Sequence, residues 1–421
     1  MKTTRATKRW ASCAAFGSMA LGACKGGVEA GNGNAASACA PSYGAGWAVA
    51  TGNSTASGIS AVAAGAHGDV GFAGAVVQDR DATGALLWND AVSATRIVPI
   101  ADGGFYIAGD AVGDAGLFAP SVMRLDGNGG TVWSQTVGPI ADFGQSFLAA
   151  DPAGGVWILG TQVMTPSDPG FNNPGLFGVF LARLDPNGNL MWSEMLGELG
   201  MNYARGIAVG PSGAAFVALQ ANGGPISLGD LDDGGYSWPS PIVASIGRDG
   251  TVTWAQVISP MGDQNDQVTA LALGVDGTVY AAGTSDLPEA IGTSLMVDAF
   301  VTALSEDGEI QWRQLYSDYP QMGGPLLATR PCGGLVLAAA TSDPANPVVV
   351  LDLDNSGDEQ RRRLLSCVGG AMCVVIPTDL IAHGGDGVVM TGRFWGAPFA
   401  FDTITLGTTL SLDSFIARIA E

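Results

Sequence analysis

The chain has 421 residues, of which 47% are hydrophobic and only 14% are charged, so it is long and apolar enough to bury a large core. Glycine is abundant, at 63 residues, and no long polar tract is present, which is typical of a folded, turn-rich protein rather than a disordered one. The formal net charge of −21 gives a surface that repels nucleic acid and anionic lipid headgroups. These properties exclude a nucleic-acid-binding protein and a protein that its own surface charge holds at a membrane.

The first 23 residues have the pattern of a processing signal. Four basic residues lie within the first nine positions, and an apolar run, 10–20, follows them. The tetrad Leu-Gly-Ala-Cys that ends at Cys24 resembles the bacterial lipobox, in which a peptidase cuts before a cysteine whose thiol carries diacylglycerol. The resemblance implies a lipoprotein signal peptide over 1–23 and a lipid on Cys24. The alternative is an ordinary secretory signal with a chance cysteine.

The next segment, 24–45, is rich in Gly, Ala, Asn and Ser and is predicted to be a flexible tether to a folded domain, 46–421. Cleavage removes four basic residues and no acidic one, which changes the net charge from −21 to −25. We therefore expect membrane attachment through the N-terminal lipid only, since nothing later is long and apolar enough to span a bilayer. Lys25 follows the anchor where an Asp would resemble an inner-membrane retention signal. We expect an extracytoplasmic lipoprotein at the outer membrane or cell surface.

From residue 59 onward the chain repeats one unit. The second half of each unit is a hairpin of two alternating strands around an Asp- and Gly-rich turn, and it ends in a Trp, as in LARLDPNGNLMW, 181–192. These Trp residues lie at positions 88, 133, 192, 254 and 312, and Arg361 takes the equivalent place in a sixth copy. The first half is a second hairpin, as in TALALGVDGTVYAAG, 269–283. Two hairpins make a four-stranded sheet, which buries both faces only between identical sheets around an axis.

The number of units predicts the fold. First hairpins begin near residues 59, 96, 146, 206, 268, 326 and 379, so we predict an all-β, seven-bladed β-propeller with four-stranded antiparallel blades. The last copy lacks its outer strand, and GWAVATG, 46–52, supplies one with a Trp at position 47. The ring is therefore expected to close by an N-terminal outer strand that joins the C-terminal blade. Six or eight blades, a β-solenoid and a two-sheet sandwich are the alternatives.

Two of the repeat segments also resemble a known group. VTALALGVDGTVYAAG and VDAFVTALSEDGEIQW, 268–283 and 297–312, resemble the propeller repeats of secreted bacterial proteins that are often called SBBP repeats. The resemblance covers roughly residues 46–421 and implies the propeller fold and an extracytoplasmic location. It implies little about activity.

Few residues point to catalysis. Lys25 is the only lysine after the predicted signal, so Schiff-base chemistry and a phosphate-binding lysine loop are nearly excluded. The two histidines, His67 and His383, both fall in turns. No HExxH, GxSxG or zinc-type cysteine spacing is present, and the innermost strands are mostly Ala, Val, Leu and Gly. We therefore assign no catalytic residue, no metal and no cofactor, and we favour a protein that is not an enzyme.

Four cysteines besides Cys24 follow the predicted signal, an even number in an oxidising compartment. Cys367 and Cys373 lie in one connection after the sixth blade, so they can close a small loop. Cys332 lies in a turn of that blade, on the face from which the closing strand, preceded by Cys39, enters the ring. We predict the disulfides Cys39–Cys332 and Cys367–Cys373, each of which requires a Cα separation below about 7 Å.

Long connections between the second and third strands of blades 3, 4, 5 and 7 are predicted to lie together on the face opposite the tether. They span roughly 161–178, 221–240, 284–297 and 393–412. Their aromatic residues, with acids between them, are candidates for ligand binding: Phe171, Tyr236, Trp238, Phe394, Trp395 and Phe399. The alternative is that these side chains pack the loops onto the blades.

The predicted function is that of a lipid-anchored, monomeric binding or scaffold module, whose partner is a protein or a polysaccharide contacted by the loop-rich face. A hydrolase or lyase that acts with carboxylates at the central funnel is the first alternative. A purely structural member of an envelope complex is the second.

Overall fold

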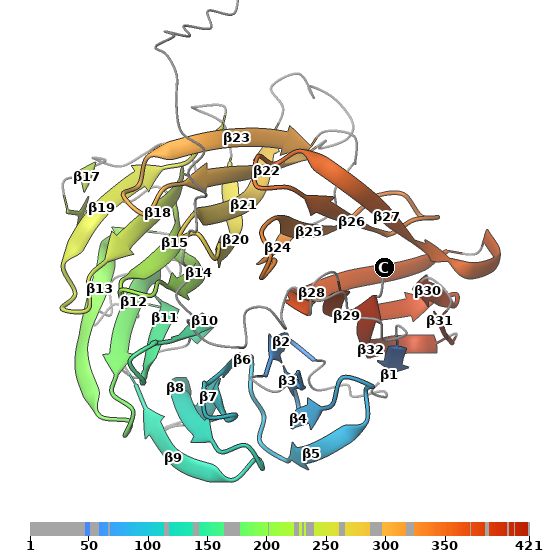
Figure 1. The fold of residues 1–421 in the computed structure, drawn as a ribbon, viewed down its shortest axis with the longest axis horizontal. Coiled ribbons are helices and arrows are strands. Elements are labelled where there is room, and N and C mark those ends of the chain that lie inside the picture. Colours follow the sequence, from blue (N-terminus) through green and yellow to red (C-terminus); the bar gives the residue numbers. More distant parts are fainter. Residues whose placement is uncertain are drawn as a thin grey trace, which may run out of the picture.

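Seven antiparallel sheets stand around a central axis like the blades of a propeller (Figure 1). The computed structural model describes residues 47–50, 59–65, 68–112, 118–137, 143–163, 177–200, 202–222, 227–229, 231–232, 240–260, 266–286, 297–316, 324–370, 372–383, 387–401, 404–407 and 409–419. The predicted seven-bladed, all-β fold is confirmed. Within these residues the longest helix is the three-residue 3₁₀ turn η2 (Val368–Gly370), and no helix is long and apolar enough to cross a membrane.

Each blade has four strands, here A to D from the axis outward. The first three blades are β2 (Ala61–Ala64), β3 (Val70–Ala73), β4 (Val77–Arg80), β5 (Leu86–Asp90); β6 (Arg96–Pro99), β7 (Phe105–Val112), β8 (Phe118–Leu125), β9 (Thr131–Thr136); and β10 (Phe143–Ala150), β11 (Val156–Val163), β12 (Phe177–Leu184), β13 (Leu190–Gly200). Blades 4 and 5 are β14 (Tyr203–Val209), β15 (Ala215–Ala221), β18 (Ser240–Ile246), β19 (Val252–Val257); and β20 (Gln267–Leu273), β21 (Val279–Asp286), β22 (Val297–Leu304), β23 (Ile310–Tyr316).

The last two blades are joined by an extra hairpin. They are β24 (Leu326–Thr329), β25 (Leu335–Ala340), β26 (Val348–Leu353), β27 (Glu359–Cys367); and β28 (Cys373–His383), β29 (Gly387–Gly396), β32 (Thr409–Ile419), β1 (Trp47–Ala50). The connection between strands B and C of blade 7 forms the hairpin β30 (Phe399–Phe401) and β31 (Ile404–Leu406), and β30 pairs with β27 of blade 6. Blade 4 carries a shorter hairpin at the same place, β16 (Ser227–Leu228) and β17 (Leu231–Asp232).

The outer strand of blade 7 comes from the other end of the chain. β1 pairs antiparallel to β32 with Trp47 opposite Arg418, the position that Trp312 occupies opposite Ala303 in blade 5. Blade 7 also contacts blade 1 directly, since the Val62 N–H donates to Asp379 Oδ2 at 2.8 Å and the Thr378 hydroxyl donates to the Ile59 carbonyl at 3.1 Å. The pairing of β1 with β32 thus covers the outer edge of β32 and ties the two ends of the described chain together.

The core lies between the blades rather than inside any one of them. The buried apolar residues form seven clusters within the described residues, and each cluster joins two neighbouring blades. At the closure, for example, Val62 and Phe72 of blade 1 pack with Val389 and Ile416 of blade 7. A single blade would therefore expose two apolar faces, which explains why the sequence repeats the unit around a full circle.

The repeated turn and the repeated Trp form one contact between neighbouring blades. In blade 3, Asp185 Oδ1 accepts the backbone N–H groups of Asn187 and Asn189 at 2.8 and 2.9 Å, and Gly188 closes the turn with φ of 84°. The indole of Trp133, from the outer strand of blade 2, covers this turn and donates to the Pro186 carbonyl at 2.9 Å. A Cβ built on Gly188 would lie 2.8 Å from the indole.

The same contact recurs around the ring. The indole N–H groups of Trp192, Trp254 and Trp312 donate to turn carbonyls of the next blade at 2.7 to 2.8 Å. Each acceptor lies two residues before the left-handed Gly of its turn: Arg248, Glu306 and Asn355. The Trp therefore fills the widening space between outer strands and at the same time hydrogen-bonds the neighbouring turn.

Replacement of the turn glycine tests this contact. Gly188→Ala introduces a left-handed alanine, a strain of about 1–2 kcal/mol, and also pushes a methyl into the Trp133 ring, which adds about 1–3 kcal/mol. Gly68→Ala is the matched control, since Gly68 has φ of 81° and nothing lies within 4 Å of its Cβ position. Thermal melting is expected to show a clearly larger loss for Gly188→Ala, and equal losses would contradict the packing role.

Candidate functional site

The aromatic residues expected on the loop-rich face divide into three groups. Phe171, Tyr236 and Trp238 lie outside the described residues. Phe394 and Phe399 are buried, at 1% and 0% exposure, so the expectation that they are exposed for ligand contact is wrong. Trp395 is 38% exposed and is the one member of the set that the described residues place at the surface.

The extra hairpin explains the burial of the two phenylalanines. Because β30 pairs with β27, the connection of blade 7 folds against blade 6, and the Phe399 ring packs 6.2 Å from that of Phe415. Phe394 precedes Trp395 in β29, and successive residues of a strand point to opposite faces, so Phe394 faces the core and Trp395 faces outward. The alternative that aromatic residues pack the loop onto the blades thus holds for Phe394 and Phe399.

Trp395 lines a cleft of about 540 Å³ between blades 6 and 7. The walls come from the B–C connection of blade 6, the chain that enters β28, and the end of β29. The lining is mainly apolar: Ala339, Ala340, Pro344, Pro347, Met372, Val374, Val375, Ile376, Pro377 and Trp395, with Gly324, Thr341, Ser342, Asp343 and Cys373. The rim of the cleft carries apolar side chains that are exposed to solvent, since Met372 and Ile376 are 71% and 45% accessible.

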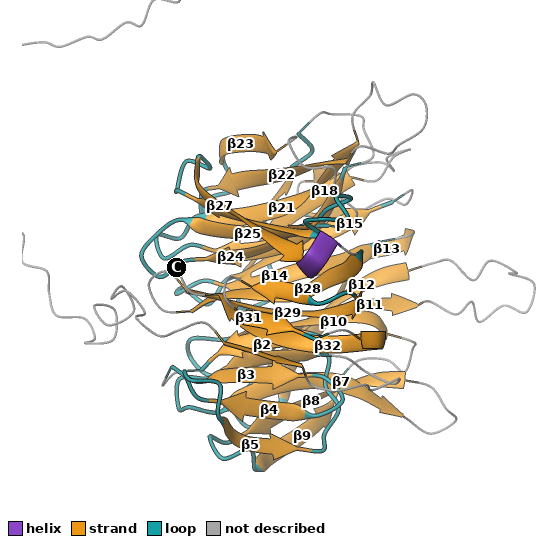
Figure 2. Ribbon diagram, turned by 90° about the vertical axis from the view of Figure 1, so that its right-hand side faces the viewer, coloured by secondary structure: helices purple, strands orange, loops and turns teal. Residues whose placement is uncertain are grey.

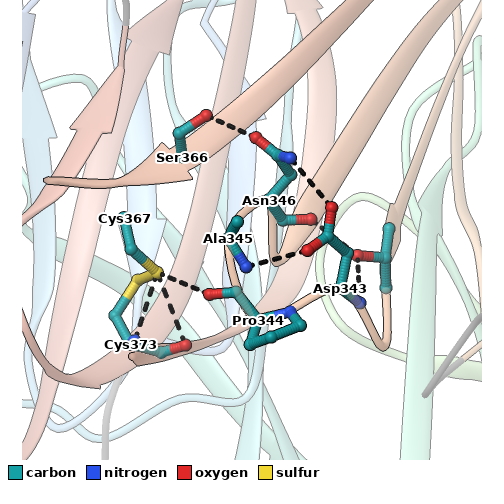
Figure 3. Close-up of a disulfide and its surroundings, with 8 residues drawn as sticks. Asp343, Pro344, Ala345, Asn346, Ser366, Cys367 and Cys373 are labelled. Atoms are coloured by element: carbon teal, nitrogen blue, oxygen red, sulfur yellow. Dashed lines mark hydrogen bonds between the residues drawn. A yellow bond between two sulfur atoms is a disulfide. The ribbon is translucent and has the colours of Figure 1, made fainter. Parts of the chain in front are cut away.

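The predicted disulfide Cys367–Cys373 is present and lies beside this cleft (Figure 3). Its Cα atoms are 5.7 Å apart, within the limit that the bond requires. The Cys373 N–H donates to Cys367 Sγ at 3.1 Å, and the Pro344 carbonyl oxygen lies 3.3 Å from the same sulfur. The bond thus joins the end of blade 6 to the beginning of blade 7 at the wall of the cleft. Cys332 is also disulfide-bonded, and its predicted partner, Cys39, lies outside the described residues.

A hydrogen-bond network fixes the opposite wall. Asp343 accepts the Ala345 N–H at 2.9 Å and the Asn346 side-chain amide at 2.8 Å, and Asn346 in turn accepts the Ser366 hydroxyl at 2.6 Å (Figure 3). The Thr341 hydroxyl donates to the Asn346 carbonyl at 2.6 Å. These bonds lower the pKa of Asp343, the Asn346 amide contributing most, and they hold the turn in place without any ligand.

A second candidate site lies on the propeller axis. The A strands of all seven blades line a cavity of about 330 Å³. Three charged side chains line this channel, namely Arg96 of blade 2, Arg205 of blade 4 and Asp379 of blade 7. These three residues were not expected from the sequence, in which the A strands are mostly Ala, Val, Leu and Gly. The signal that could have found them is the Arg-containing start of two A strands, Thr95-Arg96-Ile97 and Ala204-Arg205-Gly206.

A third feature is an acidic depression at the turns of blades 1 and 2. Asp69, Asp79, Asp81 and Asp102 line a hollow of about 610 Å³. Asp79 is 3% exposed, and its burial, followed by the charge of Asp69, raises the pKa of Asp79 to about 7. His383 is also buried nearby and its Nε2 lies 3.1 Å from the Gly68 carbonyl, whereas His67 lies outside the described residues. Three or more metal-ligating side chains do not gather anywhere in the described part of the chain.

Comparisons with known proteins show the fold and nothing finer. No family model and no curated protein matches the chain. Among solved structures, the WD40 domain of Neurospora crassa Pan2 is similar with a TM-score of 0.50 and 9% identity, over 89% of this chain and 94% of that one. A polysaccharide lyase, an ulvan lyase, is similar with a TM-score of 0.50 and 9% identity, over 80% and 91% of the two chains. A Bacteroides caccae protein of unknown function has 13% identity over 68% and 82%, with a TM-score of 0.37.

By its fold and by its similarity to solved structures, this protein is a seven-bladed β-propeller. This fold suits binding and scaffold modules. The solved structures of this shape include a lyase and a WD40 domain, so the shape alone does not choose between catalysis and binding. The resemblance to SBBP-type repeats stays a prediction, as do the signal peptide, Cys24 and the tether, which lie outside the described residues.

The acidic pair predicts a stability that depends on pH. The folded protein holds a proton on Asp79 more tightly than the unfolded chain, whose Asp titrates at its ordinary 3.8, so stability falls as pH rises from about 4 to 7. Asp79→Asn removes this titration. Between pH 5 and pH 8, the melting temperature of the wild type is expected to fall by about 2 °C or more relative to that of Asp79→Asn. A difference that does not change with pH would contradict the raised pKa.

Proposed function

We propose that this protein is a lipid-anchored extracytoplasmic binding module whose partner is another protein, held in the cleft beside Trp395. The observation that carries the proposal is the cluster of exposed apolar side chains that line this cleft, where Met372, Ile376 and Trp395 are each 38–71% accessible, and Val368, 40% accessible, follows the disulfide beside it. The other exposed large apolar side chains of the described residues lie on outer strands or in a turn and do not line the cleft. A clustered apolar patch that flanks a preformed cleft is typical of an interaction site.

The chemistry of the cleft favours a polypeptide over a polysaccharide. Recognition of a sugar needs several free hydrogen-bonding groups, whereas the Thr341 and Asp343 side chains are engaged in the wall itself. Pro344, Pro347, Pro377 and Trp395 instead offer rigid apolar surface, which is what an apolar side chain of a partner buries against. The net charge of −21 further favours a partner segment in which basic residues flank the apolar one.

The position of the cleft supports access from outside. The A–B and C–D turns lie on one face, where β1 begins opposite the end of β32, and η2 lies toward the other face (Figure 2). The B–C connection of blade 6, η2 and the end of β29 all belong to that second face by their order in the blades. A lipid on Cys24 would hold the first face toward the membrane and leave the cleft pointing away from it.

If the protein were instead a hydrolase or lyase, its active site would lie in the axial channel. Asp379 is the one carboxyl among the described residues that line it, whereas acid–base hydrolysis of a glycosidic bond uses two carboxyl groups. The similarity to a polysaccharide lyase is a similarity of fold at 9% identity and assigns no residue of this chain a role. The structural alternative, a member of an envelope complex, uses the same cleft as a permanent contact.

Peptide selection on the purified full-length protein tests the cleft. A displayed random-peptide library is expected to yield apolar peptides with flanking basic residues, and Trp395→Ala is expected to weaken their binding about tenfold or more. Met191→Ala is the matched control, because Met191 is 54% exposed on β13 and does not line the cleft. Peptides that bind Trp395→Ala equally well would remove the cleft from the proposal. Glycans that bind in a parallel array and are lost with Trp395→Ala would replace the protein partner by a polysaccharide.

Metabolic labelling tests the anchor. Labelled palmitate is expected to enter the wild-type protein expressed in a Gram-negative host and to be absent from Cys24→Ala, since the lipid is carried on that thiol. The variant should also leave the membrane fraction. Label that persists in Cys24→Ala would contradict lipidation at this position, and a secreted, unlabelled wild type would favour the ordinary signal peptide.

A further inference from the structure

The axial channel is lined by two arginines, Arg96 and Arg205, that differ from the arginines bound in ion pairs elsewhere in this acidic protein. Six described arginines lie within 4.0 Å of a carboxylate: Arg124, Arg183, Arg248, Arg330, Arg362 and Arg363. Arg96 and Arg205 form no such ion pair within the described part of the chain, although acidic residues outnumber basic ones by 39 to 18. Two cations without a bound carboxylate therefore line one cavity.

Arg96 is held in place by groups that do not neutralise it. Its guanidinium lies 4.6 Å from the ring centroid of Phe147 on the next blade and donates to the Thr95 carbonyl at 2.9 Å. Burial lowers the pKa of Arg96, and the more distant charge of Asp379 only partly opposes this effect. The side chain is thus fixed in direction, and it gains little electrostatic compensation from the protein.

Arg205 is aimed by a backbone irregularity. The ladder between β14 and β15 shifts register between Ala204 and Gly206, so Arg205 is the extra residue of a β-bulge. Its guanidinium lies 5.2 Å from the ring of Tyr203, its Nε makes no hydrogen bond, and burial lowers its pKa. A bulge changes the direction of the side chain at the extra residue. Here it places a second arginine, whose charge the protein only partly balances, at the wall of the channel.

Asp379 is already hydrogen-bonded and gives Arg96 only a partial counter-charge, with no ion pair within 4.0 Å. Its Oδ2 accepts the Val62 N–H at 2.8 Å and its Oδ1 accepts the Leu380 N–H at 2.9 Å. Both bonds connect or brace the closure between blades 7 and 1. Burial raises the pKa of Asp379, so its negative charge is itself disfavoured in the channel.

We propose that the channel binds a small monocarboxylate with an apolar body, with its carboxylate between Arg96 and Arg205. Guanidinium groups match the paired oxygens of a carboxylate, and a bound anion would supply the compensation that both arginines lack. Most of the remaining wall is apolar and suits the body of the ligand, and its two hydroxyls, those of Thr269 and Thr378, donate to the backbone carbonyls of Pro325 and Ile59. This site is independent of the cleft beside Trp395, so either proposal can fail alone.

Calorimetric titration of the full-length protein with acetate, hexanoate and benzoate tests the site, with hexanol and inorganic phosphate as comparison probes. Hexanoate or benzoate is expected to bind, and Arg96→Gln and Arg205→Gln are each expected to weaken binding about tenfold or more. Arg362→Gln removes one charge from the exposed outer strand β27 and should leave binding unchanged. Ala270→Phe keeps both arginines but fills the cavity, so it should also abolish binding.

The remaining outcomes overturn the proposal. Hexanol that binds as tightly as hexanoate would show an apolar cavity without anion recognition, and phosphate that binds in place of the organic acids would assign a different ligand class. Equal binding by the wild type and both arginine variants would move the site elsewhere, as would loss of binding by Arg362→Gln. No binding of any carboxylate to the wild type also refutes it. Unchanged circular dichroism and melting of each variant, measured first, separates loss of binding from loss of fold.

Discussion

The contact between a Trp on the outer strand of one blade and the glycine-containing C–D turn of the next is the interaction on which the fold depends. Its constant feature is a glycine that tolerates a left-handed backbone and leaves room for the indole, and at four seams a turn carbonyl also accepts the indole N–H. The contact couples neighbours and not strands within a blade. Stability therefore rises only when the ring is complete, and each apolar cluster lies at a seam.

The seam between blades 6 and 7, where this contact is altered, is also where the cleft beside Trp395 lies. Blade 6 has Arg361 in the place of the Trp, and at the seam with blade 7 the chain uses a disulfide and the β27–β30 pairing. These devices hold the seam while leaving an apolar cleft at its surface. At the next seam, blade 7 meets blade 1 through Asp379 and Thr378, and the closing strand β1 completes the sheet.

Charge is distributed unevenly in the protein. Many of the described carboxylates lie in exposed turns, where the Asn189 amide lowers the pKa of Asp185 and the Ser356 hydroxyl lowers that of Asp354, each together with backbone N–H groups. Elsewhere arginines form ion pairs with acids, as Arg183 and Arg248 do with the buried Asp151. In the channel, basic residues outnumber acidic ones, since two arginines and one aspartate line it and the aspartate is already hydrogen-bonded.

The sequence by itself determined the propeller, the number of blades and the pair Cys367–Cys373, because hairpin turns, strand alternation and the recurring Trp are local patterns with a fixed period. It could not determine which loop aromatics are exposed, since the burial of Phe394 and Phe399 follows from the pairing of a blade 7 hairpin with blade 6. It likewise gave no sign that Arg96, Arg205 and Asp379 share one cavity. Residues from blades 2, 4 and 7 meet only because the ring closes, and a β-bulge at Arg205 leaves no local mark in the sequence. Local patterns specify the repeating unit, and the tertiary structure alone decides which parts of different units meet.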